Sequence, residues 1–266
     1  MRDRDLKLRE VQKHELLPKH PNLVEFICAW EEEGRLFIQT ELCEYSGFCF
    51  KSCGLFGKGA QHPRRELWFW LADLVAAVNH LHSHDLLHLD IKPENIFVSR
   101  DQVCKLGDFG LIVDLKKDVL IAHEEGDSKY LAPETLNSPP SKPADIFSLG
   151  ISILELATDL DLPSRGDGWR MLREGNIPEV FTRSKFSCIF LNTLTVEPDR
   201  LKTDKLVGIL EFTVQLSPKL VHLIYWMMEP DPDKRPTAQQ LLNDASVQHY
   251  LALRCKQRPA QMVSFP

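Results

Sequence analysis

The sequence has no long apolar run and no apolar leader, and both absences exclude classes of protein. No window reaches the roughly 18 uncharged apolar residues that a membrane-spanning helix needs. The start, MRDRDLKLRE, is charged and lacks the apolar core of a signal peptide. We therefore expect a soluble intracellular protein, cytoplasmic or nuclear, without a membrane span.

The sequence also lacks basic runs and paired cysteine motifs. Its formal net charge is -6, whereas nucleic-acid binders hold phosphate backbones with excess Lys and Arg. Nucleic acid is therefore not an expected partner. The seven cysteines are scattered and form no CxxC pair, which favours reduced thiols over a disulfide or zinc framework. Cys49 and Cys53 have no second ligand pair at metal-site spacing.

The hydrophobic pattern changes along the chain from strand-like to helical. Apolar segments flank Glu33-Gly34 and predict a hairpin, and apolar residues recur at helical spacing from Arg64 to about His84. Few strands early and many helices late predict an α+β fold with two unequal lobes. The expected helices are 5–17, 64–84, 144–158, 169–174, 218–228 and 238–245, and the expected strands are 24–30, 35–41, 96–99 and 103–106.

The segment His88-Leu-Asp-Ile-Lys-Pro-Glu-Asn95 carries the strongest chemical signal. Phosphoryl transfer needs a carboxylate to orient the attacking hydroxyl and accept its proton, and Asp90 suits this role. Lys92 can neutralise charge that develops on the transferred phosphoryl group. Asn95 offers a neutral oxygen ligand for Mg²⁺. The spacing of these residues has the form of a protein-kinase catalytic loop.

Two further motifs follow in the order that this chemistry requires. Asp108-Phe-Gly110 comes after two short predicted strands, and its carboxylate would hold magnesium against the phosphates of ATP. Ala132-Pro133-Glu134 lies further on. Chance loop chemistry on another fold is a poor alternative, because three motifs occur in sequence.

These motifs identify the chain as similar to the protein kinase superfamily, which implies a two-lobed fold with ATP and Mg²⁺ as cofactors. Asp145, at the start of Asp145-Ile-Phe-Ser-Leu-Gly150, resembles the aspartate that hydrogen-bonds the catalytic-loop backbone. Arg235 resembles the arginine that pairs with the glutamate of the third motif, here Glu134. Both resemblances imply scaffolding roles.

Within this superfamily the chain resembles the Wee/Myt inhibitory branch. Glu125-Gly-Asp-Ser-Lys-Tyr-Leu-Ala-Pro-Glu134 is similar to the end of that branch's activation segment, and the stretch from Ala29 to Cys43 resembles its membrane-associated, tyrosine- and threonine-specific type. The resemblance implies a cyclin-dependent kinase–cyclin complex as protein substrate and restraint of mitotic entry. It also implies an endomembrane location for the full-length relative, which is tethered through a region beyond its kinase domain.

The same resemblance assigns the nucleotide-facing residues. Thr40 would be the gatekeeper, and Glu41 to Cys43 would form the hinge that meets adenine. Leu89 stands where the family usually has arginine and cannot form a charged hydrogen bond to a phosphorylated loop. Control by activation-loop phosphorylation is therefore not expected.

The start of the chain departs from the family pattern. Glu10 would be the glutamate of the regulatory helix, which should pair with a strand lysine that follows a Gly-rich loop. Only nine residues precede Glu10, and Lys7 would share its helix. We expect a weakened small lobe and poor ATP affinity, and a fragment or alternative transcript explains this start best.

A second departure is an extra stretch, Arg183–Thr213, between the family's Phe-Thr segment and the helix near Ser217. It is either a docking element or, as we favour, an extra translated segment without a selected role. The expected divisions are a remnant of the small lobe at 1–43, a large lobe at 44–250 that includes 183–213, and a tail at 251–266.

Three functional hypotheses follow from these observations. The first is an ATP-dependent kinase acting on threonine and tyrosine of a cyclin-dependent kinase. The second is a catalytically impaired binding module or truncated isoform that competes with an intact kinase. The third is a chain that does not fold stably.

Overall fold

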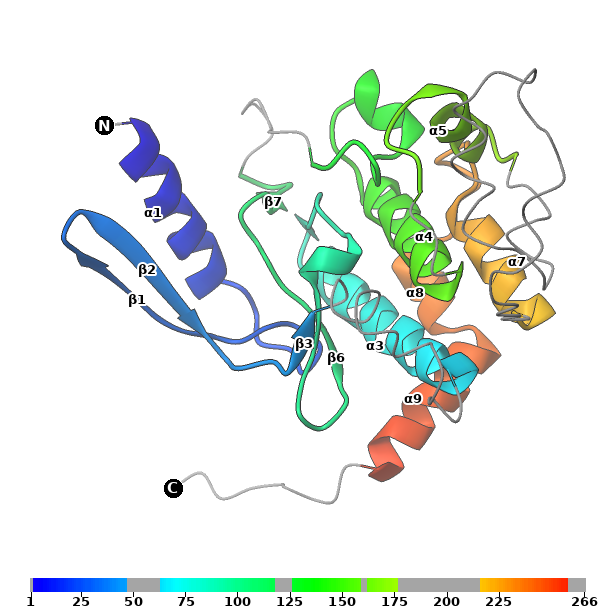
Figure 1. The fold of residues 1–266 in the computed structure, drawn as a ribbon, viewed down its shortest axis with the longest axis horizontal. Coiled ribbons are helices and arrows are strands. Elements are labelled where there is room, and N and C mark those ends of the chain that lie inside the picture. Colours follow the sequence, from blue (N-terminus) through cyan, green and yellow to red (C-terminus); the bar gives the residue numbers. More distant parts are fainter. Residues whose placement is uncertain (1, 47–62, 118–125, 159–161, 177–215, 258–266) are drawn as a thin grey trace, which may run out of the picture.

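A computed structural model describes residues 2–46, 63–117, 126–158, 162–176 and 216–257. The extra stretch 183–213, Cys49, Cys53 and Glu125 lie outside these ranges. Helix α1 (Arg2–Glu15) and the hairpin of β1 (Phe26–Glu32) and β2 (Arg35–Thr40) lie on one side of the molecule (Figure 1). The helices of the second half of the chain gather on the other side, so the α+β fold with unequal lobes is confirmed.

The hairpin forms where its turn residues predict it. β1 and β2 pair antiparallel, with Trp30 opposite Phe37 and Glu32 opposite Arg35. Glu33 and Gly34 both have positive φ, 51° and 72°, as a two-residue hairpin turn of the primed type requires. The face that carries Trp30 and Phe37 is exposed, and the two rings stack with centroids 5.3 Å apart.

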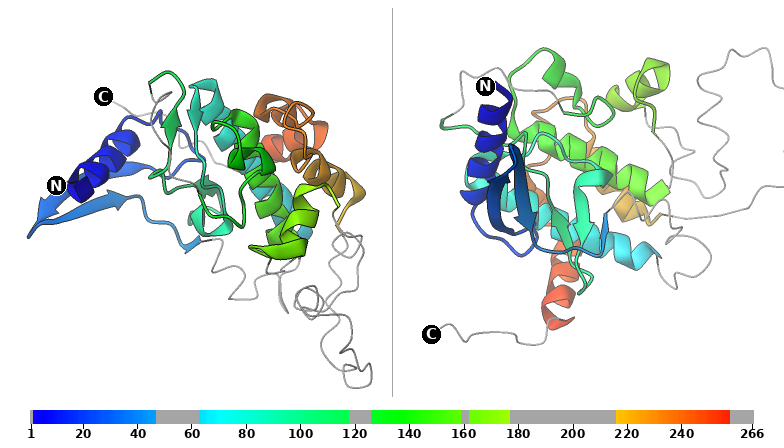
Figure 2. Two further views of the ribbon diagram at one scale, coloured as in Figure 1. Left: turned by 90° about the horizontal axis from the view of Figure 1, so that it is seen from above. Right: turned by 60° about the vertical axis from the view of Figure 1, so that its left-hand side comes forward.

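The core is built around two helices of the large lobe, α3 (Pro63–Ser83) and α4 (Lys142–Thr158). The apolar positions that predicted α3, among them Leu71, Leu74 and Leu81, are fully buried. Every residue of α4 from Ala144 to Ala157 is buried, as expected of a helix enclosed on all sides. Figure 2 shows α3 and α4 side by side, with later helices around them.

Short strands carry the chain across the end of this helical core. β3 (Tyr45–Ser46), β5 (Ile96–Val98) and β6 (Cys104–Leu106) form one antiparallel sheet in the order β3-β5-β6. β4 (Leu86–Leu87) pairs with β7 (Val113–Asp114). The predicted strands at 96–99 and 103–106 are thus confirmed to within a residue. The loop between β4 and β5 contains the 3-10 helix η1 (Pro93–Asn95), and it is the predicted catalytic loop.

The remaining helices pack onto α3 and α4. Ser217 caps α7 by accepting a hydrogen bond from the Leu220 N–H, and Thr237 forms a capping box with Gln240. A short 3-10 helix, η2 (Pro133–Leu136), contains the Ala-Pro-Glu motif. The other elements are α5 (Gly166–Arg173), α7 (Pro218–Met227), α8 (Ala238–Leu242) and α9 (Ala245–Gln257).

Helix α9 runs through the division that we expected at residue 250. Arg254, within the expected tail, is buried and donates a 2.8 Å hydrogen bond to the buried carboxylate of Asp73 on α3. The Arg254 guanidinium also lies 4.5 Å from the Phe69 ring centroid. Residues 251–257 are therefore packed against the large lobe in this structure.

Candidate active site

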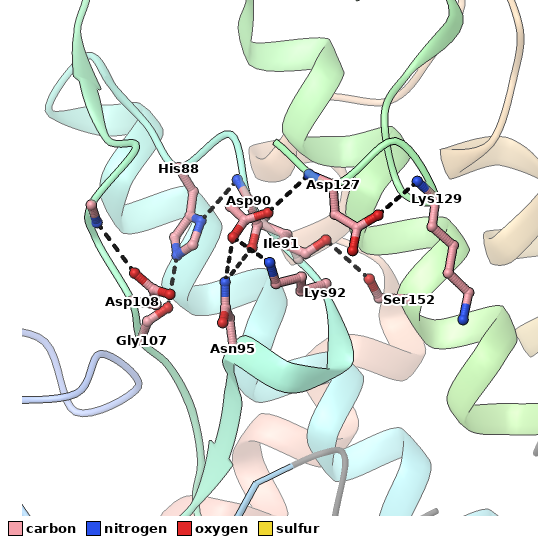
Figure 3. A network of polar contacts seen from close by, with 11 residues as sticks. His88, Asp90, Ile91, Lys92, Asn95, Gly107, Asp108, Asp127, Lys129 and Ser152 are labelled. Carbon is pink, nitrogen blue, oxygen red and sulfur yellow. Dashed lines mark hydrogen bonds and ion pairs between the residues drawn. The ribbon is translucent and has the colours of Figure 1, made fainter. Parts of the chain in front are cut away.

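The catalytic loop brings three of the predicted residues into direct contact (Figure 3). Lys92 Nζ lies 2.7 Å from Asp90 Oδ2, and Asn95 Nδ2 donates to the same oxygen at 2.8 Å. Asn95 Nδ2 also donates to the Asp90 carbonyl at 2.9 Å. The two donors fix the orientation of the Asp90 carboxylate, whose side chain is 10% exposed.

Asp145, which lies in the first turn of α4, holds the backbone of this loop in place. Its two carboxylate oxygens accept hydrogen bonds from the N–H groups of His88 and Leu89, each at 2.9 Å. His82 Nε2 lies 2.9 Å from Asp145 as well. Burial opposes ionisation of Asp145, but its contacts with His82 and His88 hold the pKa of the carboxyl below its ordinary value. The scaffolding role predicted for Asp145 is confirmed.

The loop stores backbone strain at Leu89. Its φ of 63° is in the left-handed region, which is uncommon for a side chain other than glycine, asparagine or aspartate. The hydrogen bond from the Leu89 N–H to Asp145 helps to hold this conformation.

Asp108 follows β6 and faces solvent beside the catalytic loop. Its φ is 61°, and its carboxylate accepts a long 3.4 Å hydrogen bond from the Gly110 N–H. His88 Nε2 lies 3.1 Å from the Gly107 carbonyl, which ties the two loops together. The exposed Asp108 carboxylate is thereby placed near the three residues of the catalytic loop.

A row of four aromatic rings connects this site to the small lobe. Phe109 is buried between His88 and His14, with centroid distances of 5.5 Å and 4.8 Å. His14, on α1, also contacts Phe26 of β1 at 5.4 Å. Burial lowers the pKa of both imidazoles, so they remain neutral within the row. Sequence reasoning did not identify His14.

Glu10 of α1 reaches the Asp108-Phe109-Gly110 turn. A Cβ added to Gly110 would lie 3.8 Å from the Glu10 carboxyl carbon and 3.5 Å from Asp108 Oδ1. Burial and the nearby Asp108 charge raise the pKa of Glu10. Glu10 therefore lies beside the Asp108-Phe109-Gly110 turn, and its assignment as the regulatory-helix glutamate stays a prediction.

The predicted hinge connects β2 to β3. Glu41 directs its side chain to the Nζ of Lys105 at 2.6 Å and to the Glu25 N–H at 2.7 Å, and its own N–H donates to the Glu25 carbonyl. A contact of Glu41 with adenine would therefore use its carbonyl group. Thr40 and Cys43 are half-buried, and burial raises the pKa of the Cys43 thiol.

The donor set fits magnesium and ATP. Asn95 gives its amide nitrogen to Asp90, which leaves the amide oxygen as a metal ligand, and Asp108 presents an exposed carboxylate. Hard oxygen ligands of this kind suit Mg²⁺. When bound, ATP would supply the phosphoryl group, and magnesium would neutralise part of its negative charge. Among the described residues, no group of three or more His, Cys, Asp or Glu side chains could hold a metal ion by itself.

The end of the activation segment, from Gly126 to Glu134, is fixed by long-range contacts. The predicted pair of Arg235 and Glu134 is confirmed, with two N–O distances of 2.7 Å and 3.1 Å. Lys129 reaches the fully buried Glu155 on α4 at 2.7 Å. On α5, Trp169 Nε1 donates to the Ser128 carbonyl at 2.8 Å.

The sequence analysis missed the contact of this segment with the catalytic loop. The peptide N–H of Asp127 donates to Asp90 Oδ1 at 3.3 Å. The segment was recognised by its resemblance to a known motif, but the motif gave no signal for a contact between residues 37 positions apart.

Comparison with known proteins agrees with this geometry. The protein kinase domain family matches residues 2–246. Over 252 residues the chain is 45% identical to the Caenorhabditis elegans protein named membrane-associated tyrosine- and threonine-specific cdc2-inhibitory kinase wee-1.3, covering 93% of this chain and 32% of the relative. A Drosophila melanogaster protein of the corresponding name is 38% identical over 245 residues, covering 91% of this chain and 39% of that relative.

A more distant relative has the same kind of name. The mitosis inhibitor protein kinase wee1 of Schizosaccharomyces pombe is 31% identical over 244 residues, covering 91% of this chain and 26% of the relative. The chain thus spans about a third of the length of these curated relatives. In the described residues, no helix is long and apolar enough to cross a membrane. The resemblance to the Wee/Myt branch is confirmed as a similarity, and the chain belongs to the protein kinase family.

Proposed function

We propose that the chain is the catalytic part of a kinase that transfers the γ-phosphate of ATP to tyrosine and threonine of a cyclin-dependent kinase in complex with its cyclin. Such phosphorylation would restrain entry into mitosis. The observation that carries the proposal is the contact of Lys92 and Asn95 with Asp90 beside the exposed Asp108. The names of the relatives, cdc2-inhibitory and mitosis-inhibitory kinases, support the substrate.

Each residue has a defined task in this reaction. Asp90 orients the acceptor hydroxyl and takes its proton, since its carboxylate is held in place by Lys92 and Asn95. Lys92 stabilises negative charge on the transferred group. Asn95 and Asp108 would hold magnesium, Glu10 would orient the phosphate-binding side, and Thr40, Glu41 and Cys43 would border adenine. Association with a membrane is proposed for the whole protein, because two relatives are named membrane-associated.

The rival hypothesis, a non-catalytic binding module or truncated isoform, is not favoured. The relatives with kinase names align over more than nine tenths of the chain, and the catalytic residues keep their mutual contacts.

The test is transfer of labelled γ-phosphate from magnesium ATP to a purified cyclin-dependent kinase–cyclin complex. The 266-residue chain is compared with Asp108→Ala, which removes a magnesium ligand, and with Asp101→Asn in the exposed turn between β5 and β6. We expect transfer by the chain and by Asp101→Asn and none by Asp108→Ala. Equal signal from all three, or no signal from a folded chain, would overturn the proposal.

A further inference from the structure

Asp127 lies directly against the catalytic carboxylate (Figure 3). Its peptide N–H donates to Asp90 Oδ1 at 3.3 Å. The preceding Gly126 packs so closely on the catalytic loop that an added Cβ would lie 2.3 Å from the Leu89 carbonyl oxygen. The activation segment therefore crosses the catalytic loop at the point where a substrate hydroxyl must arrive.

The position of the Asp127 side chain is set by a turn that a buried ion pair anchors. Asp127 Oδ1 accepts the Lys129 N–H at 2.9 Å, and the Asp127 carbonyl accepts the Tyr130 N–H at 2.9 Å. Lys129 Nζ in turn lies 2.7 Å from the fully buried Glu155 carboxylate. Asp127 itself remains exposed. The Asp127 carboxylate is thus held by the Lys129 N–H, while the peptide N–H of the same residue contacts Asp90.

The two oxygens of Asp90 are not equivalent. Oδ2 contacts both the Lys92 ammonium and the Asn95 amide nitrogen. These two contacts use the two acceptor positions of a carboxylate oxygen. Oδ1 receives the long bond from the Asp127 peptide and keeps acceptor capacity. The acceptor hydroxyl therefore approaches Oδ1, which is the side that Asp127 borders.

The charge around this point is strongly negative. Lys92 is surrounded by the carboxylates of Asp90, Asp127 and Asp108. Burial lowers the pKa of Lys92, but the three carboxylates raise it above its ordinary value. Asp90 and Asp108 have roles in transfer, and the proposed reaction gives none to the Asp127 charge.

From this geometry we propose that Asp127 is a specificity-determining residue of the acceptor site. Its carboxylate selects against peptides that carry a carboxylate or phosphate group beside the acceptor hydroxyl, and it favours neutral or basic neighbours. The inference rests on the proposed function, because it describes the acceptor side of the same site.

Asp127→Asn is a sharp test, because asparagine keeps a side-chain oxygen that can accept the hydrogen bond of the turn and removes only the negative charge. Its amide oxygen can still accept the Lys129 N–H, and the peptide N–H to Asp90 is unchanged. At contact distance in water, one unit of charge repulsion corresponds to about fivefold in affinity, or about 1 kcal/mol. A variant that only lost structure would weaken all peptides alike.

The experiment uses three labelled peptides that differ only in the residue before the acceptor: Glu, Gln or Lys. Their binding to the 266-residue chain, to Asp127→Asn and to Asp101→Asn is measured by fluorescence anisotropy at low and high salt. We expect the chain and Asp101→Asn to bind the Lys peptide at least about fivefold more tightly than the Glu peptide. In Asp127→Asn the ratio should fall below about twofold, and salt should narrow it in the other two proteins.

Equal ratios in the chain and in Asp127→Asn, or no binding of any peptide, would overturn the inference. Phosphate transfer to the same peptides is measured in parallel. Charge selection that depends on Asp127 without transfer would overturn the proposed function, while it would still show that the Asp127 charge selects peptides. Phosphate transfer without charge selection would overturn the inference and leave the proposed function standing.

Discussion

Arg235 and Glu134 form a two-pronged ion pair that joins residues 101 positions apart in the chain. The Arg235 side chain is fully buried, and it also donates to the carbonyls of Pro143 and Glu229. Its guanidinium lies 5.0 Å from the Phe147 ring centroid. One side chain thus holds the end of the activation segment against α4 and the loop after α7.

Arg235→Leu should destabilise the fold by about 3–5 kcal/mol, because it removes the donor to Glu134 and to the carbonyls of Pro143, Glu229 and Pro230. Urea unfolding followed by circular dichroism measures the change. The matched control is Arg170→Leu, which breaks the exposed pair with Asp167 and should cost less than about 1 kcal/mol. Equal losses in the two variants would show that the buried pair is not a structural tie.

A second prediction concerns the contact between Gly126 and the catalytic loop. In Gly126→Ala the new methyl group would meet the Leu89 carbonyl, so the activation segment must move away from Asp90. We expect phosphate transfer to fall at least about tenfold, since a shift of about 1 Å near the reacting groups has large effects on rate. Thermal unfolding should change little.

Gly168→Ala is the control for that change. A Cβ added at Gly168 would lie 3.2 Å from the Pro163 side chain. Gly168 is within helix α5, where alanine is favoured over glycine. Transfer by this variant should equal that of the unchanged chain. If Gly126→Ala also transferred phosphate at the full rate, the segment would not need to lie against Asp90.

The sequence pointed to Asp90, Lys92 and Asn95 as candidates because they are close together in the chain. The structure brings the three side chains into contact in one loop, and their catalytic roles stay predictions. The hairpin and α3 were predicted for a similar reason, since turn residues and apolar periodicity are local signals. Asp145 and Arg235 were predicted only through resemblance to a family, and the structure confirms both contacts.

The contacts that local patterns do not encode were missed. Asp127 meets Asp90 across 37 positions, and Arg254 meets Asp73 across 181. The first pair depends on how the activation segment lies on the catalytic loop and the second on how α9 packs on α3, whereas helical periodicity shows only which face is buried. The same limit explains why His14 was overlooked, because its position in the ring row is set by Phe109, far along the chain.

His14 gives a prediction about pH. Because burial lowers its pKa, with a smaller opposing influence from the Asp108 charge, the unfolded chain binds more protons than the folded one as pH falls below about 6.5. Stability is then complete above that pH and is lost as the solution becomes more acidic. His88 acts in the same direction.

In His14→Leu, part of this acid sensitivity should disappear. The free energy of unfolding is measured in urea at several values between pH 5.5 and 7.5, and the variant should show a smaller decrease than the unchanged chain. His249→Gln, which alters an exposed histidine of α9, should retain the original slope. A variant slope as steep as that of the unchanged chain would contradict the buried, neutral state of His14.

The pair of Arg254 and Asp73 tests whether α9 belongs to the large lobe. Asp73 is buried and also accepts the Cys104 N–H at 2.9 Å, and Arg254→Leu removes the charged donor from this buried carboxylate. We expect a loss of about 3–5 kcal/mol in the free energy of unfolding.

A chain ending at residue 250, which removes Arg254 with its half of α9, should lose at least as much. Lys256→Leu, on the exposed side of the same helix, is the control and should change stability by less than about 0.5 kcal/mol. Full stability of the shortened chain would instead favour the predicted division at residue 250.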